Sequence, residues 1–149
     1  MMPSRYSLQK LIDKYPHLYQ KGSRHNPNVE NKPDAYIVKI TLHLKHHPIY
    51  GKNRLKITET HYKDGSPKKY RYQWELNPPS LDKSDSHITA WENESHEDDP
   101  ANQTKSEPHH HHHVPFDRTK RAENWHVRDI EAAIKEIEPF VLKGIAYTK

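Results

Sequence analysis

The sequence predicts an α+β fold, in which an antiparallel sheet of about five strands packs against a short N-terminal helix and a C-terminal amphipathic helix. Within residues 35–76, three segments alternate apolar and polar residues with the period of two that is typical of strands. An Asp64-Gly65 pair, which favours a tight turn, separates two of these segments. Residues 127–142 carry an apolar stripe at helical spacing.

The N-terminal part of the chain is expected to form a helix followed by a loop. Leucine and isoleucine residues repeat at helical spacing over residues 7–15, with Ser7 as the expected N-cap. Residues 21–35 are rich in Asn, Gly and Pro and predict a loop. We therefore divide the chain into an N-terminal helix and loop extension, residues 1–34, and a single α+β domain, residues 35–149.

The strands are expected in the following order along the chain. The three alternating segments are residues 35–46, 53–62 and 69–76, and they read as an antiparallel meander. A shorter fourth strand is predicted over residues 87–93, and residues 109–116 predict a fifth strand or an extended segment.

The composition of the 149 residues excludes several classes of protein. Cysteine is absent, which excludes disulfides, thiolate catalysis and thiolate metal sites. No apolar run reaches membrane-spanning length and the N-terminus lacks the pattern of a signal peptide, so we expect a cytoplasmic protein without a membrane partner. The net charge of +4 is compatible with a nucleic-acid partner but does not indicate one by itself.

Fourteen histidines are an excess for this length, and five of them are consecutive, from His109 to His113. In an extended segment His109, His111 and His113 would share one face of the strand. Clustered imidazoles lower one another's pKa, so that a neutral and a charged histidine coexist near pH 7. Such a pair supplies the base and the acid that RNA cleavage needs.

Two other interpretations of the histidine run remain open. The run is also typical of a low-complexity surface tract that binds metal without a specific role. Alternatively, His96, His111 and His113 could form a ligand set for zinc or a similar divalent ion.

The segment KYRYQW, residues 69–74, interleaves basic and aromatic side chains. Arginine pairs with phosphate and aromatic rings stack on bases, so Arg71, Tyr70 and Tyr72 are candidates for binding a nucleic acid. The alternative, which we favour for the aromatic residues, is that they pack in the core while the basic residues meet solvent.

The segment WENESH, residues 91–96, ends the predicted fourth strand just before a polar loop. Glu92, Asn93 and His96 therefore lie at a strand end, where chemistry is often found.

The order of these segments resembles the TumE-like toxin family. LKITETHY, KYRYQW, WENESH, PHHHHHV and IEAAIKEIEPFV follow one another over roughly residues 35–142. The order of the motifs carries the resemblance, because none of them is specific alone. It implies a growth-inhibiting toxin that acts on RNA and is neutralised by a helix-turn-helix antitoxin.

Matched residue by residue, the resemblance selects Glu59, Tyr70, Arg71, Tyr72, Asn93, His96 and His113. The histidine run is one residue longer than the family segment. Counting back from Val114, which we prefer, matches His110, His111 and His113, whereas counting forward from Pro108 matches His109, His110 and His112. Trp91-Glu92 departs from the family pattern of a basic or aromatic residue followed by Asp.

These observations predict a small endoribonuclease that uses histidine acid–base chemistry. The candidate catalytic residues are His96, His110, His111, His113, Arg71 and Glu59, and the candidate substrate-binding residues are Tyr70, Tyr72 and Asn93. In this interpretation Arg71 holds phosphate, Glu59 orients a histidine, and no cofactor is expected. The alternatives are a metal-dependent nuclease or hydrolase and a non-catalytic RNA-binding module; a homodimer is left open.

Overall fold

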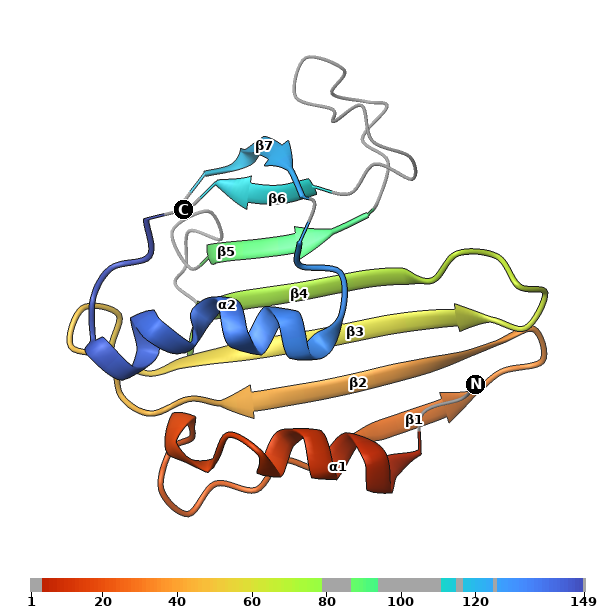
Figure 1. The fold of residues 1–149 in the computed structure, drawn as a ribbon, viewed down its shortest axis with the longest axis horizontal. Coiled ribbons are helices and arrows are strands. Elements are labelled where there is room, and N and C mark those ends of the chain that lie inside the picture. The colour runs from red at the N-terminus through yellow and green to blue at the C-terminus, as the bar shows by residue number, and fades with distance from the viewer. Residues whose placement is uncertain (1–3, 79–86, 94–110, 115–116, 125, 149) are drawn as a thin grey trace.

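The computed structural model describes residues 4–78, 87–93, 111–114, 117–124 and 126–148; for His87, residues 111–114 and residues 117–121 it describes only the backbone. The elements in chain order are α1 (Arg5–Asp13), the 3₁₀ helix η1 (Pro16–Leu18), β1 (Asn28–Asn31), β2 (Ala35–His43), β3 (Asn53–Tyr62), β4 (Lys69–Leu76), β5 (His87–Glu92), β6 (His111–Val114), β7 (Asp117–Glu123) and α2 (Ile130–Lys143). The strands form one sheet in the order β1 to β7, and each pairs antiparallel with the next (Figure 1).

The predicted α+β class with its two helices is confirmed, and the described sheet has seven strands rather than about five. The bounds of β3 and β4 are those predicted, because long alternating segments are read reliably. β1 lies in the segment that was expected to be a loop, and its four residues are too few to show a period. β7, with the sequence DRTKRAE, has almost no apolar residues to mark it.

Capping explains where the helices begin and end. Ser4, not Ser7, is the N-cap of α1: the Ser7 backbone N–H donates to Ser4 Oγ at 3.0 Å, and the Ser4 N–H donates to Ser7 Oγ at 3.1 Å. α2 begins after Asp129, whose carboxylate accepts from the Ala132 N–H at 2.7 Å, so it starts later than predicted. Within the described residues, neither helix is long and apolar enough to cross a lipid bilayer.

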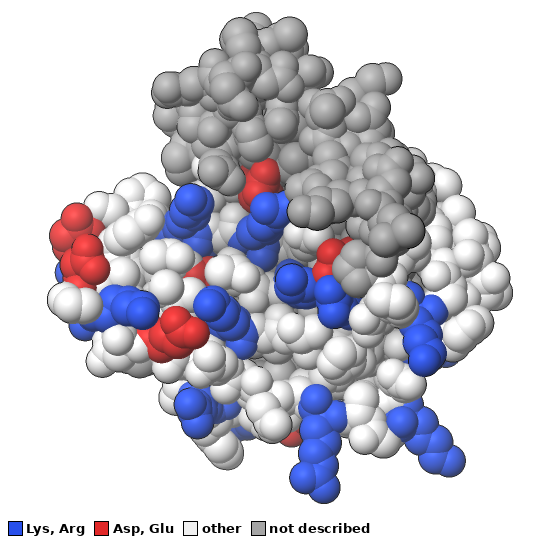
Figure 2. Space-filling view, turned by 180° about the vertical axis from the view of Figure 1, so that it is seen from behind, with Lys and Arg blue, Asp and Glu red and all other residues white. Residues whose placement is uncertain are grey.

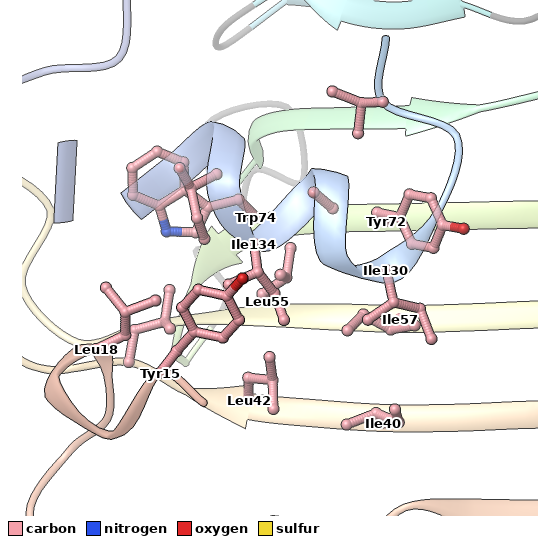
Figure 3. Close-up of a cluster of buried hydrophobic side chains, with 14 of the residues drawn as sticks. Tyr15, Leu18, Ile40, Leu42, Leu55, Ile57, Tyr72, Trp74, Ile130 and Ile134 are labelled. Atoms are coloured by element: carbon pink, nitrogen blue, oxygen red, sulfur yellow. The ribbon is translucent and has the colours of Figure 1, made fainter. Parts of the chain in front are cut away.

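The core lies between the sheet and the two helices, which cover the same face of the sheet (Figure 1). Figure 3 shows Leu55, Ile57 and Trp74 of the sheet packed beneath Ile130 and Ile134 of α2. Side chains from the N-terminal segment belong to the same buried cluster: Leu8, Ile12, Tyr15 and Leu18. We call this side of the sheet the helix face.

The opposite side of the sheet, the outer face, is polar. Along β4 the burial alternates, so that Tyr70, Tyr72 and Trp74 point into the core while the residues between them do not. The core interpretation of these three aromatic residues is therefore confirmed. Figure 2 shows Lys and Arg side chains spread over the outer face, with a few Asp and Glu among them.

Candidate nucleic-acid interface

One row of residues crosses the outer face from β3 to β7. The cross-strand partners in it are Thr58, Arg71, Glu92, His111 and Glu123, and we call this set the Arg71 row. Directly paired residues of neighbouring antiparallel strands lie on the same face of a sheet. Since neighbouring strands are about 4.8 Å apart, the backbone positions of Arg71 and His111 are about 10 Å apart.

A second row runs beside the first. Its cross-strand partners are Lys56, Gln73, Ala90, His113 and Arg121. His111 and His113 therefore have register positions on the same face as Arg71. His112 pairs with Trp91, which belongs to the buried core, so the run alternates between the two faces over residues 111–113.

Arg71 and Glu92 form an ion pair at the centre of the Arg71 row. Arg71 Nε lies 3.6 Å from Glu92 Oε2, and the side chains are 38% and 3% exposed, respectively. That separation is too long for a hydrogen bond. Arg71 Nε is buried and has no hydrogen-bond partner among the described residues. The guanidinium is thus held beside a buried carboxylate while the Arg71 side chain as a whole stays 38% exposed, which suits the binding of a phosphate.

A groove of about 300 Å³ lies beside this ion pair. Its lining consists of Thr58, Thr60, Lys69, Tyr70, Arg71 and Glu92, and Tyr70 is only 2% exposed. Two hydroxyls, two cations and one carboxylate therefore surround a space that is large enough for a phosphate and part of a sugar. The groove combines charge-assisted and neutral hydrogen-bonding groups, which is typical of sites that hold a nucleic-acid backbone.

Glu59 belongs to a different cluster, on the helix face. Its buried carboxylate accepts hydrogen bonds from the Tyr72 hydroxyl and from Lys68 Nζ at 3.2 Å, and its other oxygen lies 2.8 Å from His61 Nε2. Burial, reinforced by the Glu59 carboxylate, raises the pKa of Tyr72 far above its ordinary value. Glu59 does orient a histidine, but that histidine is His61, which stacks on Tyr36 with ring centroids 4.8 Å apart.

Tyr70 and Asn93 have structural contacts at the ends of β4 and β5. Tyr70 is 2% exposed, burial raises its pKa to about 12, and its hydroxyl accepts from Asn124 Nδ2 at 3.2 Å. Asn93 Oδ1 accepts from the Tyr70 N–H at 3.0 Å, and Asn93 Nδ2 donates to the Lys68 carbonyl at 2.7 Å. The two stacked rings of Tyr70 and Tyr72 therefore offer no free surface to a base.

The structure thus divides the residues that were selected from the sequence. Register brings Arg71, His111 and His113 to the outer face. The helix face or its edge holds Glu59, Tyr70, Tyr72 and Asn93. His96 and His110 lie outside the described residues.

His61 was not selected from the sequence, and Glu92 was noted only for its position at the end of the predicted fourth strand. The pairing of β4 with β5 reveals the role of Glu92, and no local motif encodes that pairing. His61 had a usable signal, because it lies two residues from Glu59 in a predicted strand and therefore on the same face.

Within the described parts of the chain, no three or more His, Asp or Glu side chains are grouped so that they could hold a metal ion. The metal-ligand set predicted from the sequence includes His96, which lies outside the described residues, and His111 and His113, whose backbone alone is described. That set stays a prediction.

Comparison with known proteins adds a family to this geometry. The family model described as Toxin TumE matches residues 8–144. The match covers all seven strands and α2, and it begins nearer the N-terminus than the region over which the motifs show the resemblance. No curated protein and no solved structure matches the chain.

Proposed function

Because the chain belongs to the TumE toxin family, it is the toxin of a toxin–antitoxin system, and we propose that it acts as an endoribonuclease on the outer face of its sheet. The observation that carries this proposal is the register of β4, β5 and β6, which gives Arg71, His111 and His113 positions on one face. A groove with an anchored arginine lies at the centre of that arrangement.

His111 and His113 are the proposed acid–base pair. They are two residues apart in β6, so their positions are about 7 Å apart on the same face. A phosphodiester fits between two imidazoles at that spacing, with the attacking hydroxyl toward one and the leaving oxygen toward the other. Arg71 lies two strands away, within reach of the non-bridging oxygens.

The proposed reaction is cleavage by the RNA's own 2′-hydroxyl. A neutral histidine takes the hydroxyl proton as the 2′-oxygen attacks phosphorus, and a charged histidine gives its proton to the leaving 5′-oxygen. The products are a 2′,3′-cyclic phosphate and a 5′-hydroxyl. Arg71 stabilises the charge that develops on the non-bridging oxygens, and Glu92 holds the guanidinium in place.

The remaining residues selected from the sequence have supporting roles in this proposal. His96 and His110 stay predicted members of the histidine set. Glu59, Tyr70 and Tyr72 fix β3 against β4 from the helix face, which keeps the Arg71 row in register. An antitoxin follows from the family, and we propose that it is a DNA-binding helix-turn-helix protein and that the toxin acts on cytoplasmic RNA.

The test is cleavage of RNA by the purified toxin in the presence of EDTA, with identification of the product ends. We expect cleavage with 2′,3′-cyclic phosphate ends, reduced about 10²–10³-fold in Arg71→Ala, as for the loss of other groups that stabilise transition-state charge. The double variant His111→Ala, His113→Ala should lose cleavage altogether. His46→Ala, which removes an exposed histidine in the β2–β3 connection, is the matched control.

Cleavage that is abolished by EDTA would replace the histidine mechanism by the metal-dependent alternative. RNA binding without cleavage under any condition would replace it by the RNA-binding module. Full cleavage by Arg71→Ala would show that the outer face is not the catalytic surface.

A further inference from the structure

The outer face is rich in cations and hydroxyls but poor in aromatic surface. The cationic and hydroxyl side chains at its described positions on β2, β3 and β4 include Lys39, Thr41, Lys56, Thr58, Thr60, Lys69 and Arg71. The rings at these positions are His43, half-buried against His25 with ring centroids 5.8 Å apart, and Tyr62, the last residue of β3. Neither of these rings lines the groove beside Arg71; the aromatic residue that does is Tyr70, which is only 2% exposed.

The sequences of the β4–β5 and β5–β6 connections contain no large aromatic residue in the parts that lie outside the described residues, whereas Phe116 and Trp125 also lie outside them. Residues 79–86 and 94–110 contain no Phe, Tyr or Trp. The aromatic residues of β4 face the other way, since Tyr70 and Tyr72 are 2% and 0% exposed. Sheets that bind unpaired RNA usually present several rings on which the splayed bases stack. The described outer-face side chains of β2, β3 and β4 do not offer such a platform.

The polar groups that remain match a nucleic-acid backbone. Lys69 and Arg71 are two residues apart on one face, about 7 Å from each other. Lys56 and Thr58 continue the same surface on β3, and both are exposed. Lysine and arginine hold phosphates, and threonine hydroxyls donate to and accept from a 2′-hydroxyl. Such contacts do not require the bases to leave their stack.

We propose that the outer face binds base-paired RNA through its sugar–phosphate backbone, so that the substrate of this toxin is a structured RNA rather than an unpaired strand. The inference rests on the proposed function, because it names the substrate of the same surface. Paired RNA keeps its bases inside the helix and displays phosphates and 2′-hydroxyls outside. Apart from His111 and His113, which the proposed reaction uses as base and acid, the described outer-face side chains of β2, β3 and β4 carry partners for those two groups and almost none for exposed bases.

Binding measurements with a non-cleaving protein test this inference directly. The double variant His111→Ala, His113→Ala is titrated with an RNA hairpin stem and with an unpaired RNA of the same length and base composition. We expect the stem to bind at least about tenfold more tightly, because unpaired bases find no stacking platform here. A DNA duplex of the stem's sequence should bind more weakly than the RNA stem, since it lacks the 2′-hydroxyl.

Single substitutions in the same background locate the contacts. Lys56→Ala or Lys69→Ala should each lower the slope of log affinity against log salt by about 1, the loss of one phosphate contact. Tyr62→Ala should leave affinity unchanged. Lys135→Ala, which removes an exposed cation from α2 on the helix face, is the matched control and should leave the salt slope unchanged.

The outcomes separate this inference from the proposed function. Tighter binding of the unpaired RNA, or a larger loss from Tyr62→Ala than from Lys69→Ala, would overturn the inference. Arg71-dependent cleavage of unpaired RNA in preference to the stem would also overturn it and leave the proposed endoribonuclease standing. Tight binding of the stem with no cleavage of either RNA would support the inference and remove the proposed reaction.

Discussion

The two faces of the sheet use the same strands for opposite purposes. On the helix face, β4 contributes three aromatic side chains that are no more than 2% exposed, and the charged groups there are tied to one another through Glu59. On the outer face, the same strand contributes Lys69 and Arg71, and Arg71 Nε has no hydrogen-bond partner among the described residues. A cluster with satisfied hydrogen bonds stabilises a fold, whereas a charged side chain that stays partly exposed, as Arg71 does, is suited to a ligand.

The comparison also changes the meaning of a motif. The segment KYRYQW predicts one nucleic-acid-binding surface, but in the structure its basic and aromatic residues lie on opposite faces of the sheet and cannot contact the same ligand. The basic residues reach the outer face, and the rings fill the core. Substitutions on either face should therefore have separable effects on stability and on RNA.

The largest expected contrast is between Leu55 and Lys56, which are neighbours on β3. Leu55 is fully buried and Lys56 is exposed. Leu55→Ala should lower the free energy of unfolding by about 2–5 kcal/mol, because it removes buried methyl groups and leaves a cavity. Lys56→Ala should change it by less than about 0.5 kcal/mol while weakening RNA binding. Urea unfolding of the two variants measures the difference, and equal losses would contradict the division into two faces.

Glu59→Gln tests whether the helix-face cluster is structural. The Gln side chain presents an amide donor to groups that already donate to Glu59, so we expect a loss of about 1–3 kcal/mol in the free energy of unfolding. Tyr72→Phe, which leaves Glu59 its other two partners, should lose only about 1 kcal/mol. Both values come from urea unfolding. An unchanged stability in Glu59→Gln would contradict the structural role of this cluster.

Arg71→Lys tests whether RNA cleavage on the outer face depends on the shape of the Arg71 side chain or only on its charge. Lysine keeps the positive charge but lacks the planar fork that contacts two phosphate oxygens. We expect RNA cleavage to fall about tenfold, equivalent to about 1.4 kcal/mol, while urea unfolding changes little. The matched substitution on the helix side is Arg5→Lys in α1, which should leave cleavage unchanged. Full cleavage by Arg71→Lys would mean that charge alone matters at this position.

The smallest expected effect is a change in how stability depends on pH. Burial raises the pKa of Tyr70 to about 12, from an ordinary value near 10. Below pH 10 the phenol is protonated in both states, and its stabilising contribution is complete. Above pH 10 the unfolded chain releases the proton first, so stability falls until about pH 12. Tyr70→Phe should flatten this fall by about 1 kcal/mol per pH unit, measured by urea unfolding at pH 9, 10 and 11. An unchanged slope would contradict the raised pKa.

Local patterns in the sequence predicted most of the fold but could not predict which residues meet. The long alternating segments predicted β3 and β4 with the observed bounds, and the apolar stripe predicted α2. The sequence did not predict β7, because pairing with β6 rather than an apolar pattern holds its polar residues in the sheet. Grouping Glu59 with Arg71 failed although the alternation indicated two faces. Glu59 has the phase of the buried Leu55 and Ile57, whereas Arg71 has the phase opposite to that of the buried aromatic residues of β4.

The position of α2 in the chain has a consequence for biosynthesis. Each strand of the sheet pairs with the strand that precedes it in the chain, so all paired strands are neighbours in sequence. The helix that covers Leu55, Ile57 and Trp74 follows all seven strands. During translation, the helix face stays uncovered until this helix emerges from the ribosome, and a nascent chain that stops before residue 130 has no complete core. Such fragments should be proteolysed rather than accumulate, so toxicity requires translation through α2.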